Sequence, residues 1–526
     1  MTAKRLIYNA RVLTQADGLV LDSIALNKSR IVAVGRNLQH DPDFKSYRKI
    51  DLKGLTVTPG FIDAHTHFYY MALTYGRVWL QGLTSVEACL ETIRSFAAPL
   101  KKNEWVVGEG FELDKFRRRV ELNRHTLDSV TGGRPAFFFS KDQHTAWVNS
   151  RALKLAGVTR RTAQPTGGRI VRDADGEPTG ILLEGPAIGQ VYKLIGPPSA
   201  EQLQRYFRHA LETAHRRGVT GVHSFDGPEA LAFFTERAEQ GRLGLRINYY
   251  LAAETLPLLR RASVRYGAGD EYLRVAGVKI FGDGSLGSQT AFCFNKYPGG
   301  GYGIETTGPA ELRRLIRSAA RLGLPCAVHA IGDRAVANVI DAFAAAPALK
   351  STGRHRIEHL QMIRRKDVPR LKRLSVTASM QPSHCPADID LVRKYWGARG
   401  RNAYVFRTLI DSGIPLAFGS DAPIEPLDPL AGIAAAVSRS RPGRRDRFYP
   451  EQRITAAEAL HCFTVGPAYA TCQEQTRGYL LPGYPADLVI LSDDVTKVAV
   501  SAIAKIEVLA TILGGRVMYC QAGLEL

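Results

Sequence analysis

The stretch TPGFIDAHTHF, residues 58–68, ends an apolar run with two histidines at alternate positions, His65 and His67. On a β-strand, residues i and i+2 point to the same side, so both imidazoles face one common space. Taken alone, a His-x-His pair is more typical of a packed core or a surface than of a metal site. The rest of the chain therefore has to decide between these interpretations.

Short apolar runs alternate with helix-like stretches downstream of this segment. Strands joined by helical crossovers form a parallel sheet. Counting 56–65 as the first strand, eight such runs are present, the number that closes a (β/α)8 TIM barrel. The sequence thus predicts an α/β fold of the TIM-barrel type. The seven further runs are 218–225, 245–252, 274–281, 325–331, 355–360, 375–382 and 414–421.

Two regions of the chain do not fit a simple barrel. The segment between the first two predicted strands is far longer than one crossover needs, so residues 68–205 are predicted to be an insertion, a lid subdomain on the active-site face. Both chain ends consist of short strand-like runs with turns between them. We predict that 1–58 and 471–526 form one composite β-sandwich domain, which leaves 59–67 and 206–470 for the barrel.

The composition is that of an ordinary globular protein of two or three domains, with 526 residues, 45% hydrophobic and 23% charged. No apolar run at the N-terminus is long enough for a signal peptide, and none approaches the ~20 residues of a membrane span. The seven cysteines are scattered without a Cys-x-x-Cys pair, which argues against a disulfide framework. These features predict a cytoplasmic protein with no membrane partner.

The net charge of +20 is the one unusual bulk property, and basic clusters occur at 115–119, 364–373 and 441–447. Nucleic-acid binding would be one explanation. However, the arginines are mostly spread over amphipathic stretches, and no nucleic-acid-binding motif accompanies them. We therefore predict no nucleic-acid partner, and instead a solvated basic surface or attraction of anionic substrates.

Ligand-type side chains stand at the ends of five predicted barrel strands. Barrel enzymes build their sites at the C-terminal strand ends, so these side chains should converge. Burying them unpaired would cost several kcal/mol each, and a bound metal removes that cost. Imidazoles with a carboxylate favour zinc, with iron, manganese or nickel as alternatives. The residues are His65 and His67 on the first strand, Lys279 on the fourth, His329 on the fifth, His359 on the sixth and Asp421 on the eighth.

Lys279 raises the question of one ion or two. Four histidines and an aspartate fill one site but not two, and a lysine ammonium is a poor ligand. After reaction with carbon dioxide, the lysine carries a carbamate whose two oxygens bridge two ions. We predict one or two Zn²⁺ ions, with carboxylated Lys279 bridging a binuclear site. This prediction fails if Lys279 is unmodified and pairs with an acidic side chain.

The order and spacing of these segments resemble the amidohydrolase superfamily, in particular the amidohydrolase 3 branch typified by N-substituted formamide deformylases. The resemblance covers nearly the whole chain and includes DQHTAWVNSRAL, VKIFGDGSLGSQTA, AVHAIGDRAV, RIEHLQ, GSDAPIEPLDP and LPGYPADLVILS. It implies a barrel with a β-sandwich from both ends. It also implies that His65 and His67 bind the more buried ion, that carboxylated Lys279 bridges, that His329 and His359 hold the second ion, and that Asp421 binds metal and acts as base.

The resulting prediction is a metal-dependent hydrolase of a small-molecule amide, such as an N-formyl or N-acyl amine, at a C–N bond outside peptides. Metal-activated water attacks the carbonyl, and Asp421 takes its proton and passes it to the leaving nitrogen. His144 in the insertion and His384 after the seventh strand are further catalytic candidates. Asp283 and Ser285 are predicted supporting partners of Lys279.

Three alternatives are weighed against this function. Deaminases of the superfamily use one metal and usually carry a glutamate after the fifth-strand histidine, where this chain has Gly332 and Asp333. A cyclic-amide hydrolase acting on hydantoin- or imidazolone-like rings shares the same chemistry, so only pocket shape separates it. A catalytically silent regulatory or binding protein would need a broken ligand set, and none of the six positions is broken. A homodimer is left open as the assembly.

Overall fold

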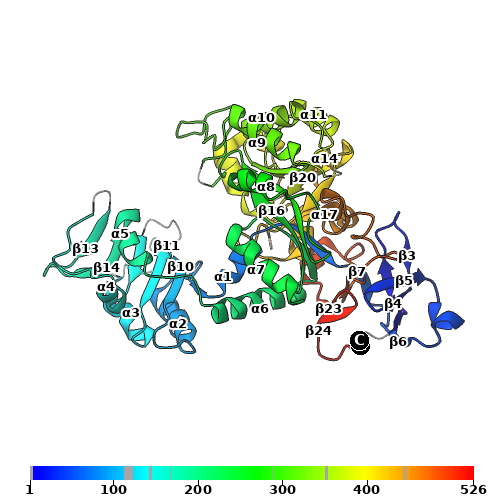
Figure 1. Ribbon diagram of the computed structural model, residues 1–526, viewed down its shortest axis with the longest axis horizontal. Helices are drawn as coiled ribbons and strands as arrows, with labels where there is room; N and C mark the ends of the chain where they lie inside the picture. Colours follow the sequence, from blue (N-terminus) through cyan, green and yellow to red (C-terminus); the bar gives the residue numbers. More distant parts are fainter. Residues whose placement is uncertain are drawn as a thin grey trace. The chain divides into compact units, whose positions relative to one another are not determined.

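Eight parallel strands form a barrel sheet in the computed structural model of the chain (Figure 1). The first and last strands meet, because the Asp421 N–H donates to the His65 carbonyl at 2.7 Å and Thr66 pairs with Ala422. In order around the barrel the strands are β8 (Phe61–Thr66), β15 (Val219–Ser224), β16 (Arg246–Ala252), β17 (Leu273–Phe281), β18 (Cys326–Ala330), β19 (Arg356–His359), β20 (Thr377–Met380) and β21 (Leu416–Phe418).

The structure describes residues 4–111, 122–140, 145–165, 168–287, 289–349, 353–441, 443–444 and 447–526. The chain divides into two units, Met1–Tyr70 with Leu211–Leu526, and Met71–Ala210. The first unit holds the barrel and a β-sandwich, and the second holds a separate sheet with its own helices.

Helices connect the barrel strands, and several of them pack on the outside of the sheet (Figure 1). In α9, Pro309 stands in the first turn, and Leu312 and Ile316 lie on the buried face while the arginines point outward, the pattern of an amphipathic helix. The helices are α6 (Ala200–Arg216), α7 (Pro228–Glu239), α8 (Leu256–Arg261), α9 (Pro309–Arg321), α10 (Asp333–Ala344), α11 (Val368–Arg373), α12 (His384–Ala387), α13 (Ile389–Leu391), α14 (Phe406–Asp411), α15 (Pro429–Ser438), α16 (Ala456–Cys462) and α17 (Val465–Ala470).

Both chain ends build the β-sandwich. Strand β7 pairs antiparallel with β22, so residues from the two ends share one sheet, and one apolar core includes Ile7, Ile24, Val57, Leu488 and Ile512. One sheet contains β24 (Arg516–Cys520), β23 (Val508–Leu513), β22 (Leu488–Leu491), β7 (Thr56–Pro59), β2 (Arg11–Leu13) and β3 (Val20–Leu21), and the other contains β5 (Arg30–Gly35), β4 (Ser23–Asn27), β1 (Arg5–Tyr8) and β6 (Arg48–Asp51). The predicted fold class is confirmed.

One predicted strand boundary is wrong. The run 56–65 is not one barrel strand, because β7 belongs to the sandwich and only β8 to the barrel. The chain passes from one sheet to the other at Gly60, where an added Cβ would lie 2.3 Å from the Thr220 hydroxyl oxygen. Only glycine allows this close approach.

The second unit has a six-stranded sheet between two apolar cores. Val78, Ile93 and Trp147 belong to one core, and Phe137 and Ile188 to the other. The three-domain boundaries and the lid role stay predictions. In sheet order the strands are β13 (Arg169–Arg172), β14 (Pro178–Leu183), β12 (Thr145–Val148), β11 (Ala136–Ser140), β10 (Val106–Phe111) and β9 (Arg77–Trp79), and the helices are α1 (Phe68–Thr74), which begins in the first unit, α2 (Val86–Ala97), α3 (Arg124–Thr131), α4 (Ser150–Leu155) and α5 (Glu184–Tyr192).

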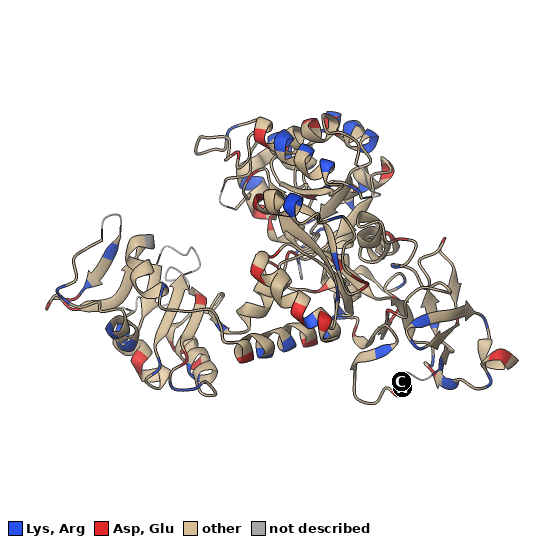
Figure 2. Cartoon of the chain, in the orientation of Figure 1, with Lys and Arg blue, Asp and Glu red and all other residues tan. Residues whose placement is uncertain are grey.

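Basic side chains occur on many elements, with acidic side chains between them (Figure 2). Some are paired locally, for example Arg364 with Asp367 at 2.6 Å. The cluster 115–119 lies outside the described residues. Within the described ranges, no helix combines the length and apolar character that crossing a bilayer requires.

His355 couples the stability of the barrel to pH. Its ring stacks on Phe343, and its Nδ1 accepts the Cys326 N–H at 3.1 Å. Burial lowers the pKa of His355 to about 4, below the ~6.5 of the unfolded chain. The unfolded state therefore takes up the proton first, and stability is lost as the pH falls from ~6.5 towards 4.

We expect His355→Gln, which keeps an acceptor for the Cys326 N–H, to reduce this acid sensitivity. Between pH 7 and pH 4 the variant should lose about 3 kcal/mol less unfolding free energy than the parent protein. Urea unfolding at both pH values measures the difference. An identical loss in the two proteins would show that His355 is not the group responsible.

Candidate metal centre

The six predicted ligand side chains lie around one cavity of about 410 Å³ at the C-terminal ends of the barrel strands. His65 lies in β8, Lys279 in β17, His329 in β18 and His359 in β19. His67 directly follows β8, and Asp421 is the third residue after the end of β21. His384, from α12, also lines this cavity. Side chains that are far apart in the sequence therefore share one space.

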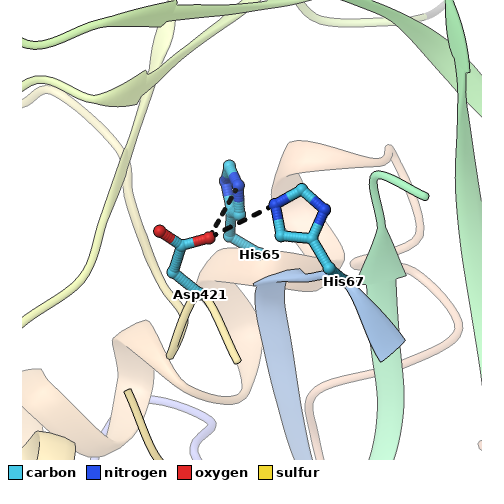
Figure 3. A group of neighbouring side chains, drawn as sticks. All are labelled: His65, His67 and Asp421. Carbon is cyan, nitrogen blue, oxygen red and sulfur yellow. Dashed lines mark ion pairs between the residues drawn. The ribbon is translucent and has the colours of Figure 1, made fainter. Parts of the chain in front are cut away.

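His65, His67 and Asp421 form the first group able to hold a metal (Figure 3). The Nε2 atoms of the two histidines lie 3.5 Å and 3.4 Å from the same Asp421 oxygen. Although burial opposes ionisation, the electrostatic interaction with His65 and the hydrogen bond with His67 hold the pKa of Asp421 well below its usual range. The buried His65 Nε2 has no hydrogen-bond partner among the described residues, an arrangement that a metal would satisfy.

His359, His384 and Asp421 form a second such group, with ligand atoms within 4.8 Å of one another. The His384 Nε2 lies 3.9 Å from the other Asp421 oxygen and, in the described part of the chain, also lacks a hydrogen-bond partner. The sequence suggested a catalytic role for His384, whereas its position also makes it a candidate metal ligand. Asp421 belongs to both groups and so joins them.

Three of the histidines have one ring nitrogen bound by a protein acceptor, which leaves the other nitrogen for a metal. Burial, reinforced by the Lys279 charge, lowers the pKa of His65 to about 4 and that of His329 to about 3, so both rings are neutral, as metal ligands must be. The contacts are His65 Nδ1 to Glu358 Oε2 at 2.6 Å, His329 Nε2 to the Gly284 carbonyl at 3.0 Å and His359 Nδ1 to Gln381 Oε1 at 2.9 Å.

Lys279 is buried with its Nζ 4.5 Å and 5.0 Å from the ring centres of Phe225 and Phe281. No carboxylate of the described residues lies within 4.0 Å of this Nζ, so the acidic partner that would count against carboxylation is not found there. Burial lowers the pKa of Lys279 to about 8, which increases the fraction of neutral amine. Carboxylation requires that neutral amine, but it stays a prediction.

The remaining candidates lie in different places. Asp283 accepts the N–H groups of Phe292, Ile331 and Gly332 and so orders the loop after β18; burial raises its pKa to about 7. Ser285 lines the cavity. His144 lies outside the described residues, so its predicted catalytic role has no structural description.

Two buried carboxylates that sequence reasoning missed support the centre. Asp63 accepts the N–H groups of His65 and Ser420 and thereby links the ends of β8 and β21. Glu358 contacts the His65 ring. The sequence positions of both residues could have marked them as neighbours of predicted ligands. Asp63 shares a strand face with His65, and Glu358 directly precedes His359.

A barrel with imidazoles, a lysine and a carboxylate at its strand ends defines the class of metal-dependent barrel hydrolases. Residues 48–519 match the amidohydrolase family, so the chain belongs to that family. This confirms the predicted enzyme class, a hydrolase of C–N bonds other than peptide bonds.

Three relatives illustrate the match. YtcJ of Bacillus subtilis (strain 168) is 32% identical over 483 residues, 90% of each chain. The N-substituted formamide deformylase of Arthrobacter pascens is 26% identical over 543 residues, 98% of each chain. The crystal structure of an uncharacterized metal-dependent hydrolase from Pyrococcus furiosus has a TM-score of 0.77 and 29% identity, covering 94% of this chain and 100% of that one.

Proposed function

We propose that the chain hydrolyses the C–N bond of a small N-formyl or N-acyl amine. The observation that carries this proposal is the position of Asp421, whose two oxygens each face a separate group of histidines. A carboxylate placed between two metal-capable groups is suited to accept a proton from an attacking water. The similarity to an N-substituted formamide deformylase over 98% of both chains supports an acylated amine as substrate.

Zinc is the proposed metal, since imidazole and carboxylate ligands suit it. The unpartnered Nε2 atom of His65 fits such an ion. His65 and His67 would hold one ion, His329 and His359 a second, with Lys279 as its carbamate between them and Asp421 beside them. When bound, these ions supply Lewis acidity and lower the pKa of water.

The chain's own residues move the proton. Asp421 is ionised and can accept a proton from water that attacks the carbonyl carbon. Asp421 then donates that proton to the nitrogen as the C–N bond breaks, because an amide anion is a very poor leaving group. His384, 3.9 Å from Asp421, would face the substrate at the same step. The products are a carboxylic acid and an amine.

The cavity volume fits a small molecule, since ligand pockets usually span about 300–1,000 Å³. The cytoplasmic location and the homodimer remain predictions.

Turnover of the N-formyl and N-acetyl derivatives of one amine, compared with hydantoin, tests the substrate class. We expect kcat/KM for a linear amide at least about tenfold above that for hydantoin, or roughly 1.4 kcal/mol. Faster hydantoin turnover would favour the cyclic-amide alternative.

Lys279→Met tests the bridging role of the lysine. Methionine keeps an apolar chain against Phe225 and Phe281 but offers no amine for carboxylation. We expect the variant to bind one zinc ion where the parent protein binds two. Elemental analysis of both proteins after zinc reconstitution measures the ratio, and equal metal content would exclude Lys279 as a bridge.

A further inference from the structure

A buried ion pair in the barrel interior contacts the candidate metal centre through His65. Arg356 and Glu358 both lie in β19 and both are fully buried. The Arg356 guanidinium donates hydrogen bonds from two nitrogens, Nε and Nη2, to the Glu358 carboxylate, the latter at 3.0 Å. The second carboxylate oxygen also contacts the His65 Nδ1 at 2.6 Å. Glu358 therefore stands between a permanent cation and a candidate metal ligand.

Arg356 connects this carboxylate to four other barrel strands. These contacts hold the Arg356 guanidinium in one orientation, since its acceptors lie at fixed places on several strands. The other contacts of Arg356 are to the Ala64 carbonyl at 2.6 Å in β8, to His223 Nδ1 at 2.7 Å in β15, to the Tyr250 hydroxyl at 3.3 Å in β16 and to the Ser379 hydroxyl at 2.6 Å in β20.

The chemistry of this contact decides which nitrogen of His65 carries the proton. A carboxylate held by an arginine is ionised and can only accept hydrogen bonds. The His65 Nδ1 must therefore be the donor, and the lone pair of the neutral ring is left on Nε2. That atom points to the Asp421 oxygen and, among the described residues, has no other partner.

We infer that Glu358 is a positioning residue for metal binding, because it fixes the tautomer and the ring orientation of His65. Arg356 in turn holds the Glu358 carboxylate in the position that this contact requires. The inference rests on the proposed function, because it requires a metal at His65. A purely structural role would instead make this pair equivalent to the Arg246–Asp487 pair. There, Asp487 accepts from Nε and Nη2 of a buried arginine at 2.6 Å and 3.1 Å, in the same unit but away from the cavity.

Glu358→Gln separates these roles. The amide offers one acceptor and one donor where the carboxylate offers two acceptors, so it cannot satisfy both Arg356 and the His65 Nδ1–H. Asp487→Asn makes the equivalent change in the control pair. Zinc affinity is measured on the full-length proteins by competition with a chromophoric chelator. We expect about 10–100-fold weaker binding for Glu358→Gln and less than a twofold change for Asp487→Asn.

A second variant covers the case in which Glu358→Gln does not fold. The double variant R356M/E358M leaves neither charge unpaired, a replacement that buried ion pairs tolerate better than loss of one partner. It still removes the acceptor from His65, so the same loss of zinc affinity is expected. Zinc affinity equal to that of the parent protein in either variant, or an equal loss in Asp487→Asn, would overturn the inference. Absence of zinc binding by the parent protein would overturn the proposed function itself.

Discussion

Asp421→Asn is expected to lower kcat by about 10²–10⁴-fold, the range that general acid–base catalysis contributes. The asparagine side chain has nearly the same shape but cannot accept a proton from water at neutral pH. It also cannot deliver one to the leaving nitrogen. Steady-state turnover of an N-formyl amine by the parent and the variant protein measures the loss.

Zinc content and the circular dichroism spectrum serve as controls for this variant, because Asp421 also faces both groups of histidines. The loss of kcat should persist when the variant is assayed with saturating zinc. A variant that retains more than about a tenth of the parent kcat would remove Asp421 from the proton path.

The double variant His65→Ala/His67→Ala is expected to lose turnover altogether. Both imidazoles face one Asp421 oxygen, and the remaining residues of this group offer a single carboxylate, which is insufficient for a tight zinc site. The part of the native-state stabilisation that comes from zinc at this group should be lost with it. At 100 times the dissociation constant that stabilisation is about 2.7 kcal/mol.

Thermal melting with and without zinc reports this loss independently of activity. The matched control is His40→Ala/His125→Ala, which removes two exposed histidines that do not line the cavity. The control should keep both its zinc-induced rise in Tm and its turnover. A rise of equal size in both double variants would show that zinc binds elsewhere.

The barrel and its ring of polar side chains are predictable from the sequence for a physical reason. Strands buried on both faces must be apolar, so a histidine or lysine at the end of such a run is conspicuous. Lys279, His329 and His359 stand out in this way, and the structure places all three on the cavity wall. The alternation of runs and helices predicted the parallel order of the sheet in the same manner.

Features that depend on packing between distant segments could not be predicted from the sequence. The run 56–65 divides at Gly60, where the backbone lies close to Thr220, a residue 160 positions further along the chain. The role of Glu358 depends on its contact with His65, a residue 293 positions away. The backbones of His359 and Asp421 adopt positive φ angles of 70° and 63°, which only tertiary contacts stabilise in such residues.

In the proposed function, hydrolysis depends on metal ions held by the side chains at the ends of the barrel strands. Elemental analysis of the purified protein, before and after chelation and after zinc addition, tests this dependence most directly when turnover is followed on the same samples. We predict stoichiometric metal that leaves with the chelator, turnover that is lost with it, and recovery of both on adding zinc. Undiminished turnover in the metal-free protein would contradict the claim.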